Sequence, residues 1–166
     1  MQLTSSEAAK LLRKYNDELA SLHNLEEQSS TFTVSVGEKE EEVRPAYDYA
    51  ATRDKISELE GKVRALKHAL NQFNCSTQVP GFDMTIDQML VYLPQLTAKK
   101  NKLAGMKNRL PKTRQTRYNS NLVEYTLINY DPAQVEADFE AVSDELARAQ
   151  TALDTVNTGV RFTWEA

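Results

Sequence analysis

One uninterrupted apolar seam constrains the fold of this sequence more than any other feature. Its side chains recur in alternating steps of three and four residues, as Ile56, Leu59, Val63, Leu66, Leu70 and Phe73. This spacing lines up apolar side chains in one narrow stripe along a helix, which is the pattern of coiled-coil-like packing. A second seam of the same kind follows Asp131 and Pro132, which fit an N-cap and the first position of a helix. Long helices of this kind need partners along their length.

Four segments carry this helical period, and the predicted helices span about residues 4–28, 45–74, 85–110 and 131–157. Thr4 with Glu7, and Thr85 with Gln88, each fit a capping box at a helix start. Pro94 lies inside the third segment, where we expect a kink or a break. We therefore predict a mainly α fold in a single domain spanning residues 1–166. Its expected form is an antiparallel four-helix bundle of coiled-coil-like long helices, with one or two small β ribbons.

The β ribbons are predicted from two stretches between the helices, residues 31–44 and 113–130. Residues 31–36 alternate β-formers with period two, and a turn near Gly37 would make a hairpin. The second stretch fits either a hairpin around Asn119–Asn121 or one long extended segment. Because an isolated two-stranded ribbon is marginal in water, we expect these segments to pair with each other or with another chain.

The composition excludes several classes of protein. One cysteine, Cys75, makes no internal disulfide, and we expect it to be half-buried; the five glycines never cluster into a phosphate loop. His23 and His68 are far apart in the sequence and do not suggest a shared metal site. The longest apolar run, Met89–Leu93, is too short for a membrane span, and no signal peptide is visible. We expect a cytoplasmic protein, not an enzyme, with no catalytic residue, cofactor, metal site or membrane association.

The net charge of −4 conceals a strong segregation of charge along the chain. The 36 residues from Gln88 to Val123 contain eight bases and no acid, so the remaining 130 residues, with 12 bases and 24 acids, carry −12. Basic side chains release counterions from phosphate, and an aromatic side chain can stack on a base. The candidate contacts to a partner or to phosphate are Lys99, Lys100, Lys102, Lys107, Arg109, Arg114, Arg117 and Tyr118.

Two other interpretations of these basic residues compete with contacts to phosphate. The fourth helix is acidic, so the bases could pair with it within one chain or across subunits, and this is the reading that we favour. The bases could also form a plain solvated face. The predicted function is a non-enzymatic structural or interaction protein that forms a homo-oligomeric helical assembly, a dimer or higher. The alternative is a nucleic-acid-associated accessory protein that uses the basic window at residues 99–117.

Short motifs spread over nearly the whole chain resemble one family of proteins. Residues 70–77 read Leu-Asn-Gln-Phe-Asn-Cys-Ser-Thr, and residues 117–120 read Arg-Tyr-Asn-Ser ahead of the Asp131 helix start. This order resembles the septicolysin-like family of small, mainly helical, uncharacterised bacterial proteins. The resemblance implies a fold more than an activity, although the family's label suggests a pore-forming toxin. For Asn71 and Asn74 we favour a structural role, capping the end of the second helix.

Overall fold

The long helices expected from the apolar seams are present, with ends that differ from the predicted ones by a few residues. A computed structural model describes residues 1–115 and 122–165, and in this part the chain is mainly helical. The helices are α1 (Ser5–Ser29), α2 (Glu40–Val43), α3 (Tyr49–Ser76), α4 (Ile86–Lys107) and α5 (Pro132–Gly159). The strands are β1 (Gln2–Thr4), β2 (Lys112–Gln115), β3 (Glu124–Leu127) and β4 (Arg161–Thr163). The chain divides into two compact units, Met1–Ser76 with Thr155–Ala166 (unit 1) and Thr77–Asp154 (unit 2).

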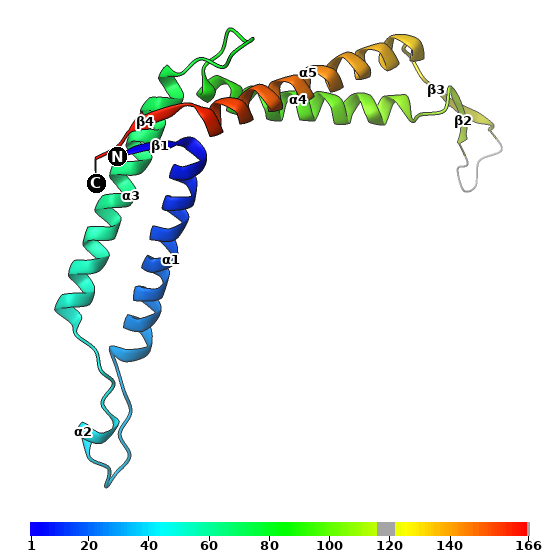
Figure 1. The fold of residues 1–166 in the computed structure, drawn as a ribbon. Helices are drawn as coiled ribbons and strands as arrows, with labels where there is room; N and C mark the ends of the chain where they lie inside the picture. Colours follow the sequence, from blue (N-terminus) through cyan, green and yellow to red (C-terminus); the bar gives the residue numbers. More distant parts are fainter. Residues whose placement is uncertain (116–121, 166) are drawn as a thin grey trace. The chain divides into compact units, whose positions relative to one another are not determined.

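In unit 1, α1 and α3 lie side by side and run in opposite directions (Figure 1). The apolar seam of α3 is the core of this pair, because Leu59, Leu66 and Phe73 are all buried. The α1 side of the pair is less complete, since Ala8 is the only residue of α1 that is buried. Its remaining seam residues are half-buried or exposed, and the pair therefore covers only part of its own apolar surface.

Unit 1 is closed by two short strands from opposite ends of the sequence, which the sequence analysis did not predict. β1 and β4 pair antiparallel, with Leu3 opposite Phe162. The ring of Phe162 stacks on Phe73 of α3, with the ring centroids 5.0 Å apart, and Trp164 lies 6.5 Å from Tyr15 of α1. These contacts anchor the terminal strands on the two helices.

The start of α1 confirms the capping box predicted from Thr4 and Glu7. The Thr4 hydroxyl accepts a hydrogen bond from the Glu7 backbone N–H at 3.2 Å, and the Glu7 carboxylate accepts one from the Thr4 N–H at 2.9 Å. The second predicted box, Thr85 with Gln88, is also present at the start of α4. Two orphan amides are satisfied at each helix start, which fixes where the helix begins.

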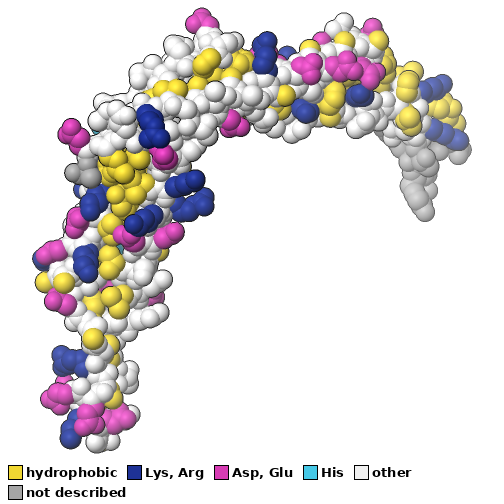
Figure 2. Space-filling model, in the orientation of Figure 1, with side chains coloured by type: hydrophobic (Ala, Val, Ile, Leu, Met, Phe, Trp, Pro, Cys, Tyr) yellow, Lys and Arg dark blue, Asp and Glu magenta, His cyan; other side chains and the backbone are white. Residues whose placement is uncertain are grey.

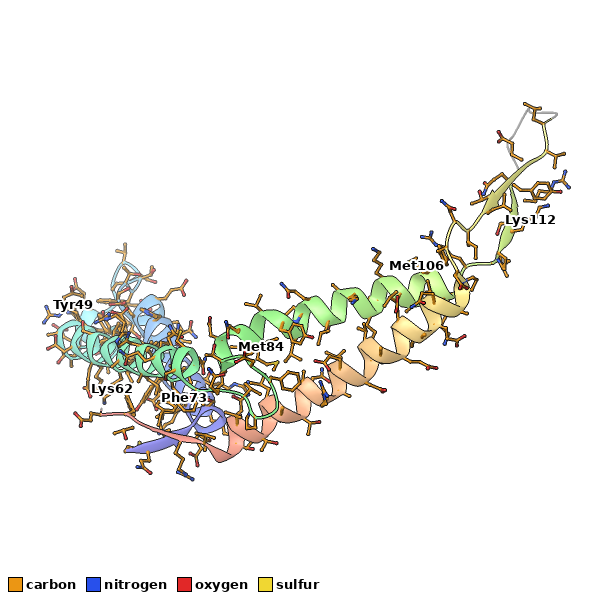
Figure 3. All side chains as sticks on the ribbon, turned by 90° about the horizontal axis from the view of Figure 1, so that it is seen from above. Tyr49, Lys62, Phe73, Met84, Met106 and Lys112 are labelled. Atoms are coloured by element: carbon orange, nitrogen blue, oxygen red, sulfur yellow. The ribbon has the colours of Figure 1, made fainter. Side chains whose placement is uncertain are left out.

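In unit 2, α4 and α5 form a second antiparallel pair, and Figures 1 and 3 both show the two helices side by side. In Figure 3, Met84 lies just before α4 and Met106 lies near its end. Tyr92 donates a hydrogen bond to Glu145 at 3.3 Å, and the guanidinium of Arg148 lies 5.3 Å from the ring of Phe82. The core of this pair consists of Ile86, Met89, Leu96 and Leu103 from α4 and Val135, Val142, Leu146, Ala149 and Leu153 from α5.

Of the kink or break expected at Pro94, the break is not observed, because α4 runs through this residue as one helix. Proline leaves the carbonyl four residues earlier, that of Leu90, without its usual helical donor. Pro94 is exposed and Leu90 is 48 % exposed, so water can take the place of the missing amide. A proline on the solvent face of a helix is tolerated for this reason.

Three local expectations from the sequence are wrong. Residues 31–44 form no strand hairpin but a turn at Gly37, with φ of 100°, followed by α2, in which Arg44 pairs with Glu40 at 3.4 Å. Cys75 is exposed rather than half-buried. Among the described residues, neither Asn71 nor Asn74 donates a side-chain hydrogen bond to the last carbonyls of α3, and the Asn74 Oδ1 is buried without a partner. Instead Ser76 donates to the Gln72 carbonyl at 2.8 Å.

Candidate interaction surface

The second predicted ribbon is present as the antiparallel pair β2–β3, which begins shortly after α4 ends. The pair is tied to the helix by Tyr130, whose hydroxyl donates a 2.7 Å hydrogen bond to the Met106 carbonyl. A backbone hydrogen bond from Ile128 N–H to the Pro111 carbonyl, at 3.2 Å, continues the ladder toward the helix. These two hydrogen bonds hold the ribbon at the end nearer the helix. Its register runs from the pair Lys112–Leu127 to the pair Gln115–Glu124.

The two faces of this ribbon differ in chemistry. Residues directly opposite each other in an antiparallel pair share a face, and successive residues alternate between faces. Lys112 and Arg114 therefore share one face with Leu127 and Tyr125, their respective partners. The ammonium of Lys112, which Figure 3 labels on the ribbon, lies 4.0 Å from the centre of the Tyr125 ring. This basic-aromatic face is backed by a polar face of Thr113, Gln115, Glu124 and Thr126.

Every residue of the two strands is exposed, including the apolar ones. Leu127 is 64 % exposed, and the adjoining Leu110 and Leu122 are 69 % and 76 % exposed. Figure 2 shows apolar and basic side chains gathered together over β2 and β3. Scattered apolar residues on a surface are ordinary, but a contiguous cluster marks a site of interaction. We call this cluster the ribbon patch; it consists of Leu110, Leu122, Val123, Tyr125 and Leu127.

The basic residues expected on the third predicted helix lie on α4 in two different settings. Lys99 and Lys102 are exposed, and neither forms an ion pair with the described residues. Lys100 is half-buried, with its ammonium 5.9 Å from the centre of the Phe139 ring of α5. These three side chains are close in sequence, but only the first two are open to an external partner.

Lys107 forms an ion pair of the kind expected between the basic window and the acidic fourth predicted helix, which is α5. Its ammonium lies 2.8 Å from the Glu136 carboxylate of α5 and 5.2 Å from the centre of the Phe139 ring. The hydrogen bond to Glu136 raises the pKa of Lys107 above its ordinary value, and Glu140 adds to the effect. Both partners are partly exposed, so the pair contributes orientation more than stability.

The remaining candidates belong to the ribbon. Arg109 lies in a shallow groove at the base of the ribbon, with Thr126 and Tyr130 among its other lining residues, and Arg114 is exposed on β2. Arg117 and Tyr118 lie outside the described residues. The sequence analysis did not select Lys112 and Tyr125, although the period-two alternation of residues 123–127 could have indicated that Tyr125 lies on one face of a strand.

Residues 1–115 and 122–165 contain no group of three or more histidine, cysteine, aspartate or glutamate side chains arranged to hold a metal ion. None of the helices there combines the length and the apolar character required to cross a bilayer.

Comparison with protein-family models and with curated proteins finds no match for this chain. The chain is similar to the crystal structure of a functionally unknown conserved protein from Corynebacterium diphtheriae. The two are 17 % identical with a TM-score of 0.62, and the match covers 98 % of this chain and all of the other. At that identity the likeness concerns the fold alone.

Proposed function

We propose that this chain is a non-enzymatic interaction protein that associates with copies of itself into a homo-oligomeric helical assembly. The observation that carries the proposal is the ribbon patch, in which five neighbouring apolar side chains are each 47–76 % exposed. An isolated two-stranded ribbon is marginal in water, so a partner that covers the patch would stabilise it. We also propose that the chain belongs to the septicolysin-like family, on the basis of the short motifs at residues 70–77 and 117–120.

The four-helix bundle expected from the sequence belongs to this proposal too. The pair α1–α3 contributes two helices, and the groove between them has Leu22 and Leu59 in its lining, with carboxylates and ammonium groups around them. A rim with both signs of charge is self-complementary, because a two-fold axis can place the acids of one copy against the bases of the other. The charged lining residues are Glu18, Lys55, Glu58 and Lys62. A second copy would then complete a four-helix bundle.

The test is the mass of the native protein measured by light scattering after size exclusion. We expect at least twice the 18.8 kDa of one chain. Leu127→Glu, which places a charge in the ribbon patch, should lower the mass, because the contact made through the patch is lost. The matched control is Leu90→Glu on α4, where the leucine is 48 % exposed but lies outside both the ribbon patch and the α1–α3 groove. A native mass of one chain at high protein concentration contradicts the proposal.

A second candidate function is supported by the basic-aromatic face of the ribbon. Lys112 and Arg114 with Tyr125 combine two phosphate-binding cations and a stacking ring, and Lys99 and Lys102 are open on α4. We propose single-stranded nucleic acid as the ligand in that case. The acidic balance of the whole chain, with a pI near 5.3, makes this candidate the weaker one.

Retention of an RNA or DNA oligomer over a salt series tests the second candidate. Lys112→Glu with Arg114→Glu should weaken binding at every salt concentration. The same change should reduce the slope of log affinity against log salt by roughly 0.7 for each phosphate that the protein no longer neutralises. Lys10→Glu with Lys67→Glu, two exposed lysines of unit 1, is the control. Absence of binding to the unmodified protein at low salt removes this candidate.

A further inference from the structure

The ribbon β2–β3 has two edges, and the direction of its backbone groups shows what each edge offers. In an antiparallel ladder, alternate residues of a strand direct both N–H and C=O toward the same neighbour. The Ile128 N–H bonds to the Pro111 carbonyl on the β2 side. Thr126 therefore also faces β2, whereas Tyr125 and Leu127 direct their backbone groups away from it. In the described sheet β3 has β2 as its sole neighbour, so those groups lie at a free edge.

The two edges differ in charge, and only one of them suits pairing with itself. β2 carries Lys112 and Arg114 within four residues, so two copies of β2 would bring like charges together. β3 reads Glu-Tyr-Thr-Leu and is preceded by Leu122 and Val123. β-branched and aromatic residues with a single charge make β3 the edge that favours addition of another strand.

We infer that two copies of this chain join through their β3 edges into one antiparallel four-stranded sheet, in the order β2–β3–β3–β2. This inference rests on the proposed self-association and names the surface that carries it. A second copy is the occupant favoured by the geometry, because an antiparallel edge presents to its own copy the donors and acceptors that it needs.

The outward backbone groups also determine the register. Tyr125 and Leu127 can exchange both hydrogen bonds with Leu127 and Tyr125 of the second copy, which uses all the outward groups of β3. Thr126 then lies on the two-fold axis, directly opposite Thr126 of the second copy. Such a pair without mutual backbone hydrogen bonds has its Cα atoms about 4.5 Å apart, within the range that a disulfide spans.

Cysteine substitution tests this register. In a Cys75→Ser background, which removes the native thiol, Thr126→Cys should oxidise to a covalent dimer. Thr113→Cys is the matched control, because Thr113 is an exposed threonine on the same face but on β2, away from the axis. We expect roughly tenfold more dimer from position 126 than from position 113 under mild oxidation, since only the first pair of thiols lies within bridging distance.

A proline substitution tests the backbone bonds themselves. Leu127→Pro removes an outward N–H and leaves the ladder to β2 intact, so the dimer dissociation constant should rise roughly tenfold or more. Leu127→Ala keeps the N–H and should have a smaller effect. A native mass of one chain overturns both this inference and the proposed function. A native dimer in which position 126 crosslinks no better than position 113 overturns the β3 interface and leaves self-association standing.

Discussion

The rings of Phe73 and Phe162 stack with their centroids 5.0 Å apart and their planes 28° from parallel. One ring belongs to the last part of α3 and the other to the strand β4, so this contact joins the helical pair of unit 1 to the terminal strands. Both side chains are buried. The contact therefore holds together two segments that are distant in sequence, and its removal should lower the stability of the whole of unit 1.

Phe162→Ala should destabilise unit 1 by about 3–5 kcal/mol, because it deletes a buried ring and leaves a cavity. Trp164 is the only tryptophan of the chain, so its fluorescence during urea unfolding reports on unit 1. Phe32→Ala is the control, since Phe32 is 38 % exposed outside the α1–α3 core. Equal effects of the two substitutions would show that the Phe73–Phe162 contact does not anchor β4.

The capping box of α1 predicts a pH dependence of unit 1. The Thr4 backbone N–H is the main cause that lowers the pKa of Glu7 below its ordinary value of 4.5, and Arg161 contributes. A carboxylate with a lowered pKa in the folded state stabilises that state above its ordinary pKa, and the stabilisation is lost as the pH falls through the folded pKa. Glu7→Gln should therefore flatten the acid side of the stability profile, measured by urea unfolding at pH 3–7.

Glu27→Gln is the control for this profile, because Glu27 is an exposed acid of the same helix that makes no cap. Thr4→Ala supplies a second readout that does not depend on titration. It should cost about 1 kcal/mol at neutral pH through loss of the N-cap. A Glu7→Gln profile identical to that of the unmodified protein would contradict the role of this carboxylate.

The inner and outer faces of α4 should respond differently to truncation. Leu103 is 8 % exposed and Leu90 is 48 % exposed, although both are leucines of the same helix. Leu103→Ala should cost about 2–5 kcal/mol, whereas Leu90→Ala should change stability by no more than about 0.5 kcal/mol. Helix content followed by circular dichroism, with hydrogen exchange of the α4 amides, separates unit 2 from unit 1. A large destabilisation by Leu90→Ala would reveal that this face is covered in the native assembly.

Replacement of Pro94 should stabilise α4. Pro94→Ala restores an N–H that can donate to the Leu90 carbonyl. It also removes the restriction that proline places on the unfolded chain, which works against stability. We expect a net increase of about 1–3 kcal/mol in the free energy of unfolding. Gly105→Ala in the same helix gives a smaller reference gain of about 0.5–1 kcal/mol, because a Cβ at this position meets no atom within 4 Å. A loss of stability for Pro94→Ala would show that proline serves the packing of the exposed face.

The sequence predicted the parts of the fold that local rules determine. Helical period and capping residues such as Thr4 and Thr85 act over a few residues, so the four long helices were foreseen. β1 and β4 were missed because each is three residues long and its partner lies at the other end of the chain. The alternation of residues 31–36 indicated strands, but with no partner strand beside them the residues turn, and local ion pairs form α2.

The candidate surface was predictable in composition but not in arrangement. A charge count finds the basic window, and it cannot show that Lys107 pairs with Glu136 while Lys99 stays open to solvent. That difference depends on which face of α4 meets α5. The neighbourhood of Lys112 and Tyr125 likewise depends on the register of β2 and β3, which is a property of the paired strands and not of either strand alone.

The pairing of Leu3 with Phe162 also sets an order in which the protein can be completed on the ribosome. Unit 2 is one continuous stretch, and it can fold as soon as its last residues have emerged. Unit 1 receives its closing strand only from residues 161–163, after all of unit 2 has been synthesised. The unit that is begun first is therefore finished after the other, and during synthesis β1 waits unpaired until residues 161–163 have been made.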